Sequence, residues 1–160
     1  MIPVRGFEGR KVAVFGLART GLTAARALIL GGAEVALWDE RPESRAAAAA
    51  EGLPLVDLTK ADWSQFAALM LSPGVPLTHP KPHWTVEKAR AAGVEILGDI
   101  ELFARAVNAA PEHKRTKIVA ITGTNGKSTT TALIGHILAR AGREREVGGA
   151  LATGQCPRPL

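Results

Sequence analysis

Cysteine and aromatic residues are scarce in this sequence, and each scarcity excludes a class of function. Cysteine occurs once, at Cys156, so the chain forms no internal disulfide and builds no metal site from several thiolates. Aromatic residues make up 4% of the chain, and the net charge of +5 comes from lysines and arginines that are scattered among acids. Nucleic-acid binding is not expected, because it relies on basic patches and on rings that stack on bases. Small anionic substrates would suit such a surface equally well.

Long apolar runs are also missing. No segment is long enough to span a membrane. The first residues, MIPVRGFEGRKVAVFG, lack the apolar stretch and cleavage site of a signal peptide. We therefore expect a cytoplasmic protein that has no membrane partner. The 160 residues, 46% hydrophobic and 22% charged, predict a globular chain with one domain, or with a small domain and part of another.

The clearest motif lies at residues 117–140, KIVAITGTNGKSTTTALIGHILAR. Residues 118–121 predict a strand, a glycine-bearing loop follows, and a helix is expected to begin at Lys127. This is the setting of a phosphate-binding loop, in which Gly123 and Gly126 let backbone N–H groups approach an anion. Lys127 would reach the outer phosphates and Ser128 would offer its hydroxyl to Mg²⁺. A strict Walker A motif has glycine where this chain has Ile121. A glycine-rich turn with an exposed lysine therefore stays the alternative.

The first forty residues predict a βαβ unit with strands at 11–15 and 34–38 and a helix at 22–30. Gly16, Ala18 and Gly21 occupy the three glycine positions of the dinucleotide fingerprint, and Asp39 stands where a ribose ligand is expected. A Rossmann-like domain is predicted. NAD is not expected as its ligand, because the Ala18 methyl lies where the pyrophosphate would press closest. Asp39 has a second interpretation, as a strand-end acid in a solvated turn.

Further strands are predicted at residues 53–58, 66–71 and 94–97, and helices at 42–51, 83–92 and 99–107, with a brief helical turn at 62–65 and Asp99 as an N-cap. The loop SPGVPLTHP follows the strand at 66–71 and begins at Ser72. Open α/β sheets hold ligands at the carboxyl ends of their strands, so this loop is expected on the same rim as Gly16 and Asp39. His79 and His83 are expected to be solvated loop residues, because no third metal ligand is in view.

Four segments in order resemble one branch of a known family. KVAVFGLARTG, SPGVPLTHP, GVEILGDIELF and VAITGTNGKSTTT are similar to the D-glutamate-adding branch of the Mur ligases over about residues 8 to 149. The resemblance implies a Rossmann-like UDP-substrate-binding domain at residues 1–107, a linker at 108–116 and the start of a P-loop ATP-binding domain at 117–149. Residues 150–160 do not resemble the family, so we expect an atypical, loosely ordered tail.

The resemblance also implies which residues bind. Residues near the UDP end of the substrate would be Gly16, Arg19, Thr20, Asp39, Arg41, Ser72 and Gly74. Residues that bind Mg-ATP would be Gly123, Thr124, Asn125, Gly126, Lys127, Ser128 and Thr129, with Lys127 catalytic and Ser128 on Mg²⁺.

The implied reaction joins D-glutamate to UDP-N-acetylmuramoyl-L-alanine at the expense of ATP, through an acyl phosphate, in peptidoglycan precursor synthesis. Lys127 and magnesium would neutralise the like charges of the attacking carboxylate and the phosphate. The third domain expected in the family lies beyond residue 160, so we expect this chain to be an N-terminal portion that does not turn over alone. We expect a monomer, with self-association of this portion left open. Two alternatives remain, a stand-alone UDP-sugar or nucleotide-binding module and half of an NAD-dependent oxidoreductase.

Overall fold

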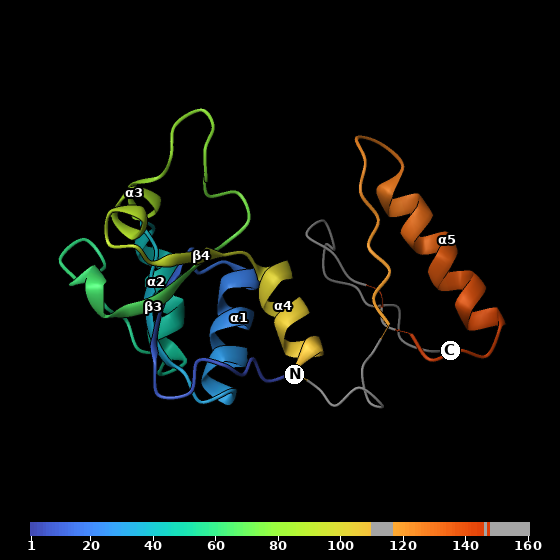
Figure 1. The fold of residues 1–160 in the computed structure, drawn as a ribbon, viewed down its shortest axis with the longest axis horizontal. Helices are drawn as coiled ribbons and strands as arrows, with labels where there is room; N and C mark the ends of the chain where they lie inside the picture. The colour runs from blue at the N-terminus through green and yellow to red at the C-terminus, as the bar shows by residue number, and fades with distance from the viewer. Residues whose placement is uncertain (110–116, 146, 148–160) are drawn as a thin grey trace. The chain divides into compact units, whose positions relative to one another are not determined.

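The computed structural model describes residues 1–109, 117–145 and 147. The chain divides into two compact units, with the division between residues 115 and 116. The first unit contains β1 (Lys11–Phe15), α1 (Arg19–Leu30), β2 (Glu34–Trp38), α2 (Pro42–Ala50), η1 (Trp63–Gln65), β3 (Phe66–Leu71), α3 (Trp84–Ala91), β4 (Glu95–Leu97) and α4 (Asp99–Asn108) (Figure 1). The second contains α5 (Lys127–Arg140). No helix among the described residues has both the length and the apolar character needed to cross a membrane.

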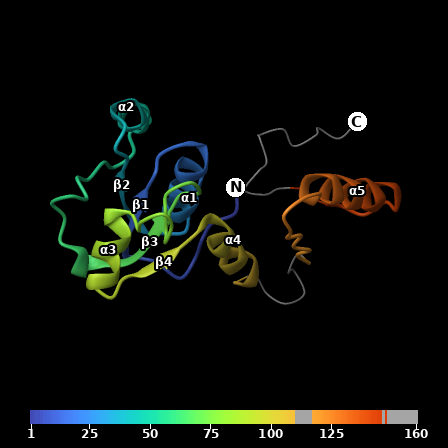
Figure 2. The ribbon, with the colours of Figure 1, turned by 90° about the horizontal axis from the view of Figure 1, so that it is seen from above.

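The first unit is built on a four-stranded parallel sheet in the order β2-β1-β3-β4. Side chains alternate along β1, so Val12 and Val14 join the core beneath α1 and α4, while Ala13 and Phe15 join the core beneath α3. Figures 1 and 2 show α1 and α4 on the face of the sheet opposite α3. The predicted Rossmann-like α/β fold is confirmed.

The chain reverses its direction of travel across the sheet at β1. It goes from β1 to β2 on one side and then crosses back to place β3 on the other side. Such a switch point opens a crevice at the carboxyl ends of the two strands that flank it, and open α/β sheets bind their ligands there. The residues that follow β1 and β3 therefore border the crevice where a ligand is expected.

The predicted strand at residues 53–58 is wrong. Only Leu55 pairs with the sheet, through one parallel bridge to Leu37 at the β2 edge. Leu37 N–H donates to the carbonyl of Pro54 and Val56 N–H to the carbonyl of Leu37, after which the chain turns through Asp57. Pro54 has no N–H to offer a ladder, which helps to confine the pairing to one residue.

The predicted strand at residues 118–121 is also wrong, because residues 117–123 have no regular secondary structure. Ile118 and Val119 are 48% and 67% exposed, and the described residues of the second unit contain no strand with which the run could pair. A strand requires a hydrogen-bonding neighbour, which β-branched composition alone does not supply.

One helix cap was also mispredicted. Asp99 is the first residue of α4 rather than its N-cap, a position held by Gly98. An acid in the first turn still favours the helix through its dipole. The predicted linker at 108–116 falls mostly on residues outside the described part, and the whole predicted tail at 150–160 lies outside it.

Candidate functional site

The glycine loop after β1 is closed by a contact that leaves no room for a side chain. Gly16 has φ +93°, a conformation that favours glycine, and its carbonyl accepts a hydrogen bond of 2.6 Å from the buried Ser72 hydroxyl. A Cβ built on Gly21 would lie 1.8 Å from the Gly16 carbonyl oxygen and 2.7 Å from Ser72 Oγ. The start of α1 is thus held directly against the ends of β1 and β3.

Asp39 ties the same loop to the end of β2. Its Oδ2 accepts a bond of 2.7 Å from Leu17 N–H, and its Oδ1 accepts one of 2.9 Å from Arg41 N–H. The residue is only 5% exposed, so the interpretation as an acid in a solvated turn is wrong. Burial alone would raise the pKa of Asp39, but the backbone bonds from Arg41 and Leu17, together with the Arg41 guanidinium, lower it below the usual value. Asp39 is an anionic side chain that links the end of β2 to the loop after β1.

The other predicted residues of this edge are more accessible. Arg19 and Gly74 are exposed and Thr20 is half-buried. The Arg41 side chain is 64% exposed and lies 3.4 Å from Asp39 Oδ1. Of the seven predicted residues, therefore, three are buried and shape the backbone at this edge, namely Gly16, Asp39 and Ser72. The other four are at least partly accessible to a ligand.

The predicted phosphate loop is in the second unit. Gly126 is the N-cap of α5 and is left-handed, with φ +77°, and Gly123 has φ +148°. The Lys127 ammonium donates to the carbonyls of Gly123 and Thr124, so it lies over the loop. Ser128 and Thr129 are exposed in the first turn of the helix, and Thr124 and Asn125 are exposed in the loop. Backbone N–H groups at such a terminus, with an ammonium beside them, are the elements of an anion site.

A family model matches most of the first unit. The family model described as "Mur ligase MurD-like, N-terminal domain" matches residues 10–98, more than half of the chain. The chain belongs to the MurD-like Mur ligase family.

Its relatives include two UDP-N-acetylmuramoylalanine--D-glutamate ligases from Caulobacter. The protein of Caulobacter sp. strain K31 is 79% identical over 154 residues, and that of Caulobacter vibrioides strain NA1000 is 80% identical. Each match covers 96% of this chain and 33% of the relative. The chain thus spans about a third of the length of the curated relatives it matches. Among solved structures, shikimate dehydrogenase from Aquifex aeolicus is similar with a TM-score of 0.49 and 17% identity, covering 64% of this chain and 47% of that one.

The MurD-like domain also contains a group of side-chain contacts that the sequence patterns did not single out. Glu40 Oε1 accepts a bond of 2.9 Å from Trp84 Nε1 and lies 3.1 Å from His83 Nε2. His83 packs on Phe15 with ring centroids 4.5 Å apart and its side chain is 15% exposed, so the prediction that it is a solvated loop residue is wrong. The spacing between Glu40 and these partners, 43 and 44 residues, matches no periodicity, so no sequence signal pointed to the contact.

No metal site of protein side chains is present in the described part of the MurD-like chain. Residues 1–109, 117–145 and 147 contain no group of three His, Cys, Asp or Glu side chains arranged to hold an ion. His79 is exposed, and its Nδ1 lies 3.1 Å from Thr78 Oγ1.

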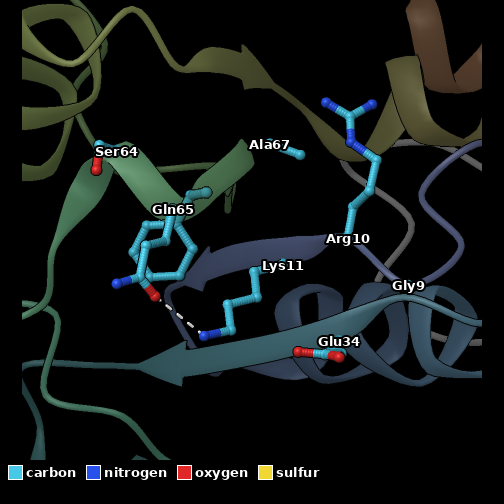
Figure 3. Close-up of a pocket in the computed structure, with 8 residues that line it drawn as sticks. Gly9, Arg10, Lys11, Glu34, Ser64, Gln65 and Ala67 are labelled. Carbon is cyan, nitrogen blue, oxygen red and sulfur yellow. Dashed lines mark hydrogen bonds between the residues drawn. The ribbon is translucent and has the colours of Figure 1, made fainter.

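A hollow of the MurD-like domain lies at the opposite edge of the sheet, where the strands begin (Figure 3). It measures about 520 Å³, and its lining includes Lys11, Glu34 and Phe66, the first residues of β1, β2 and β3. Lys11 Nζ donates to Gln65 Oε1 across 3.1 Å. None of the predicted site residues lines it, and sheets of this class bind ligands at the other edge. The hollow therefore gives no support to the predicted ligands.

Proposed function

We propose that this chain is the substrate-anchoring portion of an ATP-dependent ligase that joins D-glutamate to UDP-N-acetylmuramoyl-L-alanine in the cytoplasm. The observation that carries the proposal is the identity of about four residues in five to D-glutamate ligases across nearly the whole chain. The geometry supports it, because Ser72 bonds to Gly16 at the switch point between β1 and β3, and Asp39 ties the same loop to the end of β2.

In the first unit, the exposed groups at this edge would bind the UDP end of the substrate. Arg19 and Thr20 stand at the N-terminus of α1, where a diphosphate is favoured by the helix dipole. The Arg41 guanidinium and the backbone around Gly74 would contact the uracil and the sugar from the two neighbouring strand ends.

In the second unit, Gly123 to Thr129 would bind the phosphates of ATP, and Ser128 would hold Mg²⁺. The residues fit these ligands, because Gly123 and Gly126 have positive φ angles that favour glycine. Ser128 is also exposed. The Lys127 ammonium would offset the negative charge that builds up when the substrate carboxylate attacks the γ-phosphate to give an acyl phosphate and ADP. The amine of D-glutamate would then displace phosphate and form the amide. Magnesium, when bound, neutralises phosphate charge.

Thermal denaturation with added ligands tests this proposal. UDP and UDP-N-acetylmuramoyl-L-alanine are expected to raise the unfolding temperature of the first unit, whereas NADH is not. At a ligand concentration of 100 times Kd, the stabilisation is about 2.7 kcal/mol. Stabilisation by NADH without any response to uridine ligands would favour an oxidoreductase half, and a uridine response without catalysis in any longer form would favour a binding module.

We further propose that the 160 residues do not catalyse the ligation by themselves. The residues that bind D-glutamate and complete the reaction site are expected to correspond to the two thirds of the relatives that this chain does not cover. A coupled assay should detect no D-glutamate-dependent release of ADP from the purified chain. The longer Caulobacter ligase serves as the positive control, and turnover by the chain alone would refute this point.

A further inference from the structure

The loop of residues 72–83 is held mainly at its two ends. At its start, Ser72 N–H donates to the Phe15 carbonyl across 3.0 Å and Val75 N–H to the Ser72 carbonyl across 3.2 Å. At its end, His83 N–H donates to the Pro76 carbonyl across 3.0 Å, and α3 begins at the next residue. Residues 77–81 between them are exposed. The shape of the loop around Gly74 therefore depends on how firmly the ends are fixed.

Glu40 fixes the far end of this loop to the end of β2. One carboxylate oxygen, Oε1, faces both the Trp84 indole N–H at 2.9 Å and His83 Nε2 at 3.1 Å. The other ring nitrogen of His83, Nδ1, lies 2.9 Å from Thr85 Oγ1 in the first turn of α3. One side chain thus joins two segments that are more than forty residues apart.

The chemistry of these contacts suits a carboxylate. Hydrogen bonds to an ionised acceptor are shorter and stronger than those between neutral groups. The Trp84 indole N–H lowers the pKa of Glu40, burial opposes it, and His83 lowers it further, so the group is charged at neutral pH. Because the Glu40 side chain is 61% exposed, its contribution to overall stability is small, and its effect is on the local shape of the site.

We propose that Glu40 is a positioning residue, which acts through His83 and Trp84 to hold the loop of residues 72–83 in the form that receives the UDP end of the substrate. This inference rests on the proposed function. It goes beyond the residues expected to bind UDP, because Glu40 acts here on the protein and not on the ligand.

Hydrogen exchange of the chain without ligand tests the positioning directly. In Glu40→Ala the amides of Val75 and His83 should exchange at least about fivefold faster than in the parent, because the far end of the loop loses its anchor. Glu40→Gln keeps an acceptor for Trp84 and should lie between the two. Glu43→Ala is the matched control, since it removes an exposed carboxylate three residues away and should leave these amides unchanged. Unchanged exchange in a folded Glu40→Ala chain would overturn the inference.

Calorimetric titration with UDP then connects the loop to binding. We expect Glu40→Ala to bind UDP about tenfold more weakly than the parent at an almost unchanged unfolding temperature. Glu40→Gln should have an intermediate affinity, and Glu43→Ala should bind UDP as tightly as the parent. Equal affinity in Glu40→Ala and parent would refute the role in binding. If the parent itself does not bind UDP, the proposed function fails, and the exchange rates still decide whether Glu40 orders the loop.

Discussion

Replacing Gly21 with alanine is expected to destabilise the first unit severely. The added Cβ would stand 1.8 Å from the Gly16 carbonyl oxygen, a backbone atom that cannot rotate away as a side chain can. The start of α1 would have to separate from the ends of β1 and β3, and the hydrogen bond from Ser72 to Gly16 would break with it. Overpacking of this kind costs about 3 kcal/mol or more. In a domain of roughly 100 residues this lowers Tm by about 12 to 24 °C.

Urea and thermal unfolding followed by circular dichroism measure this effect. Gly98→Ala is the matched control, because a Cβ at Gly98 meets no atom within 4 Å and its φ of −97° suits any residue. Gly98 is the N-cap of α4, so the control should cost no more than about 1 kcal/mol. A Gly21→Ala chain that melts within a few degrees of the control would show that the contact between Gly21 and Gly16 does not constrain the loop.

Replacing Lys127 with alanine is expected to remove Mg-ATP binding while UDP binding is retained. The ammonium lies over the loop carbonyls of Gly123 and Thr124, which is where the proposed function needs a cation for the outer phosphates. Loss of one partner of a close charge pair costs about 2 to 5 kcal/mol, so the affinity for Mg-ATP should fall at least about 30-fold.

Titration calorimetry with Mg-ATP and with UDP separates the two sites. Arg140→Ala removes the same charge from the last turn of α5 and should leave both affinities close to those of the parent. If Lys127→Ala abolished UDP binding as well, the two ligands would not bind to independent sites in the two units.

The sequence predicted the strands that pair with other strands and are buried in the core. The strand at residues 11–15 alternates between two cores, and both its β-branched composition and its burial favour a strand. The run at 118–121 is also rich in β-branched residues but has no strand to pair with among the described residues, so propensity alone misled the prediction. At residues 53–58 the edge of β2 accepts a single bridge, and no pattern of apolar residues distinguishes one bridge from a ladder.

The site was predictable where the topology determines it. Parallel strands end at one edge, so a glycine loop after the first strand and a serine after a later one were expected to share a rim, and Gly16 and Ser72 are indeed in contact. The burial of Asp39 was not predictable, because the hydrogen bond that it accepts from Leu17 N–H depends on the exact path of the loop. The contact between Glu40 and Trp84 depends in the same way on how α3 is set against β2, which local sequence does not encode.

The hydrogen bond between Asp39 and Leu17 has a consequence for where an anion can settle. An amide that is already committed to a buried carboxylate is no longer offered to a phosphate oxygen. The next N–H groups along the chain belong to Ala18, the N-cap of α1, and to the first turn of the helix, and the first amides of a helix have no partner within the helix. A diphosphate at this edge would therefore take its backbone hydrogen bonds from the start of α1, beside Arg19 and Thr20.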